Sequence, residues 1–161
     1  MKILGIDPGY GRVGYGCIEV INDQVVVLGS GVITTMPGET GVENMGERLG
    51  EIRRDLKVIL ERFKPDKVAV EELFFVQNVT TGIKVAEARG VILVTCYEAG
   101  CELVDVQPTQ VKMALTGFGR ADKKQVTEML VKVLQLTTIP TPDDAADALA
   151  IAWTATLKRL K

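Results

Sequence analysis

Apolar residues in runs or in alternation predict five β-strands along this chain. The first occupies residues 3–6 (ILGI), and because no polar residue alternates there, we expect it to be buried on both faces. The second and third strands, Val13 to Val20 and Gln24 to Thr35, are separated by Asn22–Asp23, a pair typical of tight turns. The three strands therefore predict an antiparallel meander.

Two further strands lie on either side of a helical segment. They are the short apolar runs Val68 to Val70 and Leu103 to Val106, with a helix expected between them from about Val79 to Glu98. A strand, a helix and a second strand in this order form a right-handed crossover, so the two strands should be parallel. We predict an α/β fold with a mixed five-stranded sheet, three antiparallel strands then two parallel ones, and helices on both faces.

Apolar residues spaced by three and four predict the other helices. One amphipathic helix is expected from Glu43 to Phe63. The C-terminal third is expected to be helical in three pieces: about Thr109 to Leu115, Lys123 to Leu136, and Asp143 to the end. Asp122 and Gln125 are placed to form a capping box at the start of the middle piece.

Length and composition restrict the class of protein. With 161 residues, 47% of them hydrophobic and 25% charged, the chain can bury a core, and we expect a single domain over residues 1–161. No stretch reaches the roughly 18 uninterrupted apolar residues of a membrane span, and no charged-then-apolar leader precedes the first strand. We therefore expect a soluble, cytoplasmic protein.

The cysteine and histidine content excludes several kinds of chemistry. Cys17, Cys96 and Cys101 are odd in number and form no C-x-x-C motif, so we expect small buried side chains rather than disulfides or a zinc site. The chain has no histidine, which excludes His-based triads and imidazole metal ligands. The net charge of −2 argues mildly against a nucleic-acid partner, although the basic residues occur in local clusters.

Acidic residues stand where two apolar strands end and where the last helix begins. Asp7 ends the first strand before a glycine-rich turn, and Glu71 and Glu72 follow another strand, where alternation lets only one of them face Asp7. Asp144 and Asp147 are three residues apart, which places them on one helix face, and the alanines beside them allow that face to approach the sheet closely. Because ligands bind at the carboxyl ends of parallel strands, we expect these acids to converge.

Three or four converging carboxylates repel one another unless cations lie between them. Oxygen ligands favour Mg²⁺ or Mn²⁺, and two such ions about 4 Å apart can drive an in-line displacement at phosphorus. The pattern therefore indicates metal-dependent phosphodiester hydrolysis. Each part also has a simpler explanation: Asp7 as a turn former, Glu71–Glu72 as a solvated strand end, and Asp143–Asp144 as a helix cap.

Five motifs, in order over nearly the whole chain, resemble the RuvC family of bacterial Holliday junction resolvases. They are GIDPGYGRVGYG, VAVEELFF, EARGV, VKMALTGFGRADKKQV and DDAADALAIA. The resemblance implies a ribonuclease H-like fold and a homodimer that nicks four-way DNA junctions symmetrically during recombination and repair. It also implies Mg²⁺ as cofactor, two ions per active site with Mn²⁺ as a plausible substitute, and contact with the RuvA/RuvB branch-migration complex.

The same resemblance implies the site residues. By this resemblance, the catalytic acids and metal ligands are Asp7, Glu71, Asp144 and Asp147. Glu72 would then face outward, and Asp143 would only cap the last helix. Lys112 and Lys123 match positions that hold scissile-strand phosphates, with Lys124 as an alternative to Lys123 and a solvated helix face as the simpler explanation.

Two further DNA contacts are implied. Phe74 matches an aromatic residue that stacks on opened junction bases, with Phe75 as an alternative and a core position as the simpler explanation. Arg120, in the glycine-rich stretch before the ADKKQV motif, is a candidate contact to DNA.

Other functions fit part of the pattern. GID-x-G also opens the phosphate-binding loop of actin-like and sugar-kinase-like ATPases, but those proteins have two duplicated domains. A ribonuclease H-like nuclease acting on RNA would share the first strand and turn, whereas the DAADALA and ADKKQV motifs favour the resolvase. A catalytically silent DNA-binding module would have no need of the four carboxylates.

Overall fold

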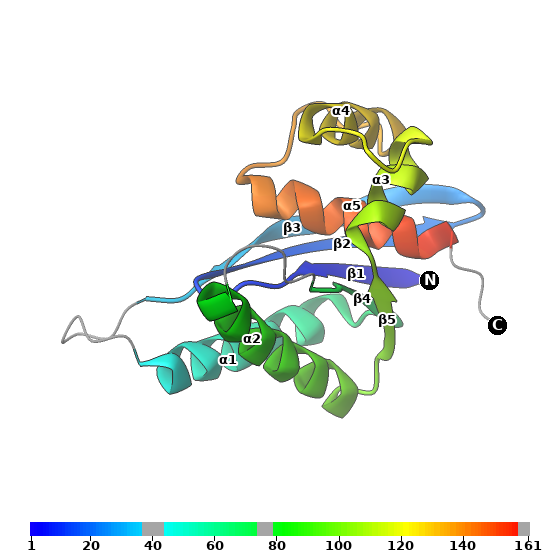
Figure 1. Ribbon diagram of the computed structural model, residues 1–161. Coiled ribbons are helices and arrows are strands. Elements are labelled where there is room, and N and C mark those ends of the chain that lie inside the picture. Colours follow the sequence, from blue (N-terminus) through cyan, green and yellow to red (C-terminus); the bar gives the residue numbers. More distant parts are fainter. Residues whose placement is uncertain (37–43, 74–78, 158–161) are drawn as a thin grey trace.

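A five-stranded mixed sheet forms the centre of the computed structural model, which describes residues 1–36, 44–73 and 79–157 (Figure 1). The strands are β1 (Lys2–Asp7), β2 (Arg12–Ile21), β3 (Gln24–Thr34), β4 (Lys67–Glu71) and β5 (Glu102–Val106). Their order across the sheet is β3-β2-β1-β4-β5. β1, β2 and β3 pair antiparallel and β4 pairs parallel with β5, as the sequence predicted. β4 also pairs parallel with β1.

The predicted meander turn is confirmed. Ile21 pairs with Gln24, and the two residues between them, Asn22 and Asp23, have φ angles of 49° and 62°. Two consecutive left-handed residues are the geometry of a type I′ turn, whose twist matches that of the flanking strands.

Helices cover both faces of the sheet. They are α1 (Met45–Phe63), α2 (Val79–Glu98), α3 (Pro108–Thr116), α4 (Lys123–Val133) and α5 (Asp143–Leu157). α1 and α2 lie on one face, and α5 lies on the other beneath α3 and α4 (Figure 1). The predicted capping box of Asp122 and Gln125 is present at the start of α4. That helix ends three residues before the predicted Leu136, and Gln135 just beyond it has a positive φ of 50°.

Alternation along the central strands divides the core between the two faces. Ile3 and Ala69 pack into the cluster under α5, whereas Leu4, Ile6 and Val68 pack against α1 and α2. β1 is therefore buried on both faces, as predicted. Some predicted parts lie outside the described residues, namely the first residue of the helix from Glu43 and the last four positions of the chain.

α5 approaches the sheet closely because glycines in the strands face alanines in the helix. A Cβ added at Gly5 would lie 2.0 Å from the carbonyl oxygen of Ala148, and one at Gly14 would lie 2.1 Å from that of Asp144. Such distances are far below van der Waals contact, so only glycine fits at these positions. The close approach brings the first turns of α5 to the end of β1, which carries Asp7.

The thiols of Cys17 and Cys96 are buried, as predicted, and burial raises their pKa values to about 11 and about 12. Cys101 is partly exposed. Within the three described ranges, no helix combines the length and the apolar character needed to span a bilayer.

Candidate active site

Asp7 and Glu71 end two neighbouring parallel strands at the same edge of the sheet. Ile6 pairs with Val70, so the two acids follow side by side. Asp7 lies two residues after Gly5, which faces α5, so the two residues point to the same side of the sheet. Glu71 lies two residues after Ala69, whose side chain packs into the cluster under α5. Both carboxyls therefore face this helix. The predicted choice of Glu71 over Glu72 as the neighbour of Asp7 therefore agrees with the strand geometry.

The electrostatics of these two carboxyls show that they share one site with α5. Burial raises the pKa of Asp7 to about 7, and repulsion by Asp147 and Asp144 contributes to the rise. Burial also raises the pKa of Glu71 to about 7, with repulsion by Asp7 and Asp147 contributing. Asp7 thus lies within electrostatic range of the other three predicted acids, and Glu71 within range of Asp7 and Asp147.

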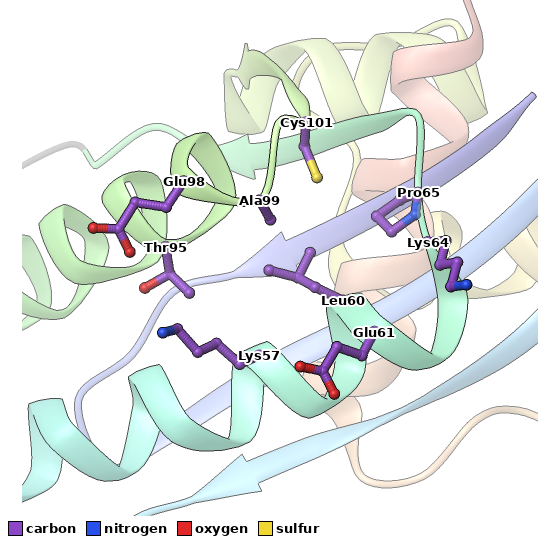
Figure 2. Close-up of a pocket in the computed structure, with 9 residues that line it drawn as sticks. All are labelled: Lys57, Leu60, Glu61, Lys64, Pro65, Thr95, Glu98, Ala99 and Cys101. Carbon is purple, nitrogen blue, oxygen red and sulfur yellow. The ribbon is translucent and has the colours of Figure 1, made fainter.

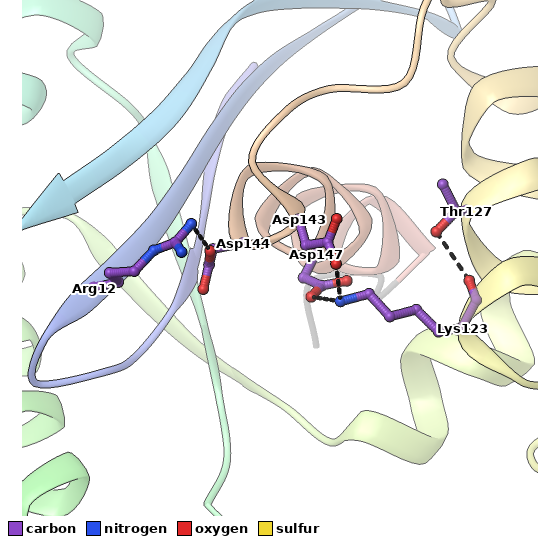
Figure 3. Close-up of polar contacts among 6 residues, drawn as sticks. All are labelled: Arg12, Lys123, Thr127, Asp143, Asp144 and Asp147. Atoms are coloured by element: carbon purple, nitrogen blue, oxygen red, sulfur yellow. Dashed lines mark hydrogen bonds and ion pairs between the residues drawn. The ribbon is translucent and has the colours of Figure 1, made fainter.

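Two cations hold the acids of α5. The guanidinium of Arg12, on β2, lies 2.5 Å from a carboxylate oxygen of Asp144. The Lys123 ammonium lies 3.0 Å from Asp143 and 3.2 Å from Asp147. Figure 3 shows Asp144 directed to one side of α5, toward Arg12, and Asp143 and Asp147 directed to the other, toward Lys123. Asp143, predicted to be only a cap, therefore also contributes to an ion pair.

These ion pairs also affect Asp147. Burial raises the pKa of Asp147, and the hydrogen bond and charge of Lys123 oppose the rise. The same contacts raise the pKa of Lys123, with the hydrogen bond to Asp143 as the largest cause. Lys123 is therefore held charged at the edge of the acidic cluster.

A cavity of about 240 Å³ opens over the acids. Its lining includes the carboxyls of Asp7, Glu71 and Asp147 together with Lys112 and Lys123, so both predicted phosphate-binding lysines border it. Lys124, the alternative to Lys123, is 85% exposed, lies 4.0 Å from Glu128 and is not among the described residues that line this cavity.

Of the other predicted DNA contacts, Arg120 is among the described residues. Arg120 is exposed in the turn between α3 and α4 and is not among the described residues that line the cavity over the acids. Phe74 and Phe75 lie outside the described residues. Their roles stay predictions.

The donor set suits hard divalent cations. The site offers carboxylate oxygens, and their mutual repulsion is relieved when a cation lies between them. Among the described residues, however, no three acidic or thiol side chains are grouped closely enough to hold an ion. Arg12 and Lys123 each hold a carboxylate of α5, on opposite sides of the helix. The residues fit Mg²⁺ in the chemistry of their donor atoms.

Sequence analysis missed three contributors to the site. Arg12 was not singled out, although it lies within the GYGRVGYG turn, and Asp143 was assigned only to a cap. Arg89, in the EARGV motif, was given no role, yet its Nε donates a hydrogen bond to the main-chain carbonyl of Glu71 at 3.0 Å. For Arg12 and Arg89, the available signal was a basic residue within a quoted motif, but its partner could not be read from the chain.

A larger cavity, of about 500 Å³, lies at the opposite end of the sheet (Figure 2). It is bordered by the C-terminal ends of α1 and α2, and charges of both signs line it, including Lys57, Glu61 and Glu98. Pro65 and Cys101, also in its lining, precede β4 and β5, so this cavity is at the amino ends of the parallel strands. Ligand sites of α/β sheets form at the carboxyl ends, where the acids lie.

Comparisons with known proteins identify the family. The profile described as crossover junction endodeoxyribonuclease RuvC matches residues 3–155. The crossover junction endodeoxyribonuclease RuvC of Thermotoga petrophila is 50% identical over 153 residues, which cover 95% of this chain and 90% of the relative. This chain belongs to the RuvC family. It is a crossover junction endodeoxyribonuclease, a Holliday junction resolvase, as its motifs predicted.

Solved structures support the same assignment. RuvC of Thermus thermophilus in complex with a Holliday junction substrate superimposes with a TM-score of 0.88 at 39% identity, covering 97% of this chain and 93% of that one. The yeast mitochondrial Holliday junction resolvase has a TM-score of 0.68 at 16% identity, covering 97% of this chain and 80% of that one, and shows the shared fold alone. The predicted ribonuclease H-like fold is confirmed.

Proposed function

We propose that this protein resolves four-way DNA junctions by metal-dependent hydrolysis at the site formed by Asp7, Glu71, Asp144 and Asp147. The observation that carries the proposal is the convergence of these carboxyls from β1, β4 and α5 at one sheet edge. Support for the substrate comes from the Thermus thermophilus RuvC structure, which is a complex with a Holliday junction.

The four carboxyls would hold Mg²⁺, with two ions per site and Mn²⁺ as a plausible substitute. When bound, such ions activate a water molecule and stabilise the leaving oxygen of the phosphodiester. A carboxyl with a pKa of about 7, such as those of Asp7 and Glu71, carries a proton about half of the time at neutral pH. A divalent cation favours the ionised form, so metal binding should release protons from this site.

Lys112 and Lys123 would bind phosphates of the scissile strand. Both border the cavity over the acids, and Lys123 is held at its edge by Asp143 and Asp147. Their positive charge would offset the repulsion between the carboxylates and the DNA backbone. Phe74 would stack on opened bases, and Arg120 would contact DNA from the exposed turn before α4.

The protein would act as a homodimer, because a two-fold axis relates two active sites to two opposing strands of a junction. α2 offers a surface for the second copy. Four of its apolar side chains recur at helical spacing on one side and are exposed: Val79, Ile83, Val94 and Tyr97, at 70%, 53%, 55% and 75%. Substituting Tyr97 with Glu should lower the measured mass in sedimentation from dimer to monomer.

The RuvA/RuvB branch-migration complex would deliver the junction, as the family resemblance implies. Because junctions arise in chromosomal DNA, we also propose that the protein acts in the cytoplasm.

The function is tested with an end-labelled synthetic four-way junction and a linear duplex of matching sequence, each with Mg²⁺ or with chelator. Paired symmetric nicks in the junction alone, only with Mg²⁺, are the expected result. Equal cutting of the duplex, or cutting in chelator, would contradict the proposal.

A further inference from the structure

Cys96 and Cys101 lie on either side of the turn that ends α2. The helix ends at Glu98, and Gly100 after it has a left-handed φ of 78°. The backbone N–H of Gly100 donates to the carbonyl of Tyr97 at 2.9 Å, and the N–H of Cys101 donates to the carbonyl of Cys96 at 3.2 Å. These two bonds define a Schellman motif, in which the side chains at the positions of Cys96 and Cys101 frequently pack against each other.

The packing of the two thiols agrees with this motif. Both side chains belong to the core cluster between the sheet and helices α1 and α2, where Cys96 is fully buried and Cys101 is partly exposed. Burial raises the pKa of Cys96 to about 12, and the charge of Cys101 contributes to the rise, so the two thiols lie within electrostatic range of each other. The backbone hydrogen bond also holds the two Cα atoms close together, and a disulfide requires a separation of roughly 4.4–6.8 Å between them.

The two thiols differ in their access to solvent. Cys101 lines the cavity of about 500 Å³ at the C-terminal ends of α1 and α2, and Figure 2 shows its sulfur directed toward the space between Ala99 and Pro65. Cys96 has no exposed surface and is not among the described residues that line this cavity. A small oxidant entering the cavity would therefore reach Cys101 first, with Cys96 beside it as the second thiol.

We propose that Cys101 and Cys96 form a modification site, at which a hydroperoxide such as hydrogen peroxide oxidises the two thiols to a disulfide. The Cys101 thiolate attacks one peroxide oxygen, so an S–O bond forms, the O–O bond breaks, and the other oxygen takes up a proton and leaves as water. Cys96 then loses its proton and attacks the Cys101 sulfur, so the S–S bond forms, the S–O bond breaks and a second water leaves. Two thiols are oxidised and one peroxide is reduced to two waters.

The site is at the far end of the sheet from the acids. Cys101 directly precedes β5, so the disulfide would link the end of α2 to the amino end of this strand. The four acids lie at the carboxyl ends of the strands and at the start of α5, so the inference does not depend on the proposed function.

Peroxide treatment of the full-length protein in the reduced state tests the proposal. The reaction is run at about pH 8.5, because burial and the charge of Asp66 raise the pKa of the Cys101 thiol and the thiolate is the reactive form. Remaining thiols are blocked with N-ethylmaleimide in denaturant, and the protein is digested with a protease that cleaves after glutamate. Cleavage after Glu98 separates the two cysteines, so the disulfide appears in mass spectrometry as a linked pair of peptides.

We expect the linked pair to account for most of the protein and to disappear when dithiothreitol is added before blocking. Cys17 is the internal control, because it is buried in the same core cluster and has no exposed surface. It should carry N-ethylmaleimide in both the treated and the untreated protein.

Two variants separate the roles of the thiols. Cys101→Ser should yield no linked pair and leave Cys96 reduced, because the remaining thiol is out of reach of peroxide. Cys96→Ala should leave Cys101 as a sulfenic acid, which dimedone traps, whereas the unaltered protein should give several-fold less of this adduct because Cys96 consumes it. Circular dichroism verifies that both variants are folded.

Absence of the linked pair, with Cys101 instead carrying two or three added oxygens, would overturn the proposal. Oxidation of Cys96 in Cys101→Ser to the same extent as in the unaltered protein would do so too. Equal oxidation of Cys17 would also contradict it, because peroxide would then be reacting with unfolded chains.

Discussion

Nε of Arg89 donates a hydrogen bond to the main-chain carbonyl of Glu71 at 3.0 Å, and the same guanidinium pairs with the carboxylate of Asp105. The Arg89 side chain is only 19% exposed. α2 is thereby joined to the carboxyl ends of β4 and β5, immediately beside the active site. The contact holds the backbone from which the Glu71 carboxyl extends, so Arg89 is a positioning residue for a proposed metal ligand.

Arg89→Lys should therefore impair metal use more than DNA binding, because lysine cannot present two planar donors to both partners. We expect about a tenfold lower kcat and a higher Mg²⁺ concentration for half-maximal cleavage. Junction affinity in chelator should be unchanged. Arg54→Lys is the control, since Arg54 is 69% exposed and pairs with its neighbour Asp55. A loss of junction affinity equal to the loss of kcat would argue for a general structural role instead.

Asp7→Asn should abolish junction cleavage while leaving folding and junction binding intact. The substitution removes one negative charge from the proposed metal site and changes little volume. Cleavage assays in Mg²⁺, with gel-shift binding and thermal unfolding on the same preparation, separate these effects. If folding and binding were lost together with cleavage, Asp7 would be a structural residue.

The metal-free protein should lose stability as the pH rises from about 4 to about 7. The pKa of Asp7 is near 3.8 in an unfolded chain and about 7 in the folded protein, so the folded state binds more protons in this interval. The stabilisation is complete below the unfolded pKa, is lost as the pH rises through the folded pKa, and changes little above it. Glu71, whose pKa is raised to about 7, contributes with the same sign.

The measurement is thermal unfolding in chelator at pH 5 and pH 8. Asp7→Asn should flatten the dependence and raise the stability at pH 8 by roughly 2 kcal/mol, or roughly 4–8 °C in Tm. Added Mg²⁺ should stabilise the unaltered protein at pH 8 and stabilise the variant less. A melting temperature independent of pH in the unaltered protein would show that these carboxyls are not buried together.

Lys123→Ala should reduce junction cleavage roughly 10- to 100-fold and lower the salt slope of junction binding by about one. The reason is that Lys123 carries its charge beside Asp147, where the scissile phosphate would lie. Lys124→Ala is a matched control from the next position, because the Lys124 side chain is 85% exposed and directed toward Glu128. Cleavage rates and salt titrations that were the same for both variants would remove Lys123 from the proposed site.

Gly5→Ala should destabilise the protein by several kcal/mol, because the new methyl group would lie 2.0 Å from the Ala148 carbonyl and force α5 away from β1. The displacement would also move Asp147, so cleavage should fall. Gly50→Ala makes the same chemical change within α1, where no atom beyond the adjoining residues and backbone of the helix itself lies within 4 Å of the added Cβ. There we expect a stabilisation of about 0.5–1 kcal/mol from helix propensity, measured by urea unfolding.

The strands and helices followed from local patterns. Residues 3–6 contain no polar alternation and became a strand buried on both faces, and Asn22–Asp23 supplied the left-handed pair that a type I′ turn needs. The placement of the four acids at strand ends and at a helix start could also be predicted, because these are local features of the sequence. The family assignment depended on the same motifs and was confirmed.

What the sequence by itself determined was therefore the identity of the elements, the placement of the acids at strand ends and at a helix start, and the family. Only the tertiary structure decided that Arg12 pairs with Asp144, that Lys123 rather than Lys124 reaches the carboxylates, and that Arg89 supports Glu71. Periodicity fixes the direction of a side chain on its own strand or helix. The sheet order and the glycine–alanine packing of α5 bring distant segments of the chain within a few ångströms of one another. These contacts decide which charged side chains become partners, and no local sequence pattern encodes the distance between two such segments.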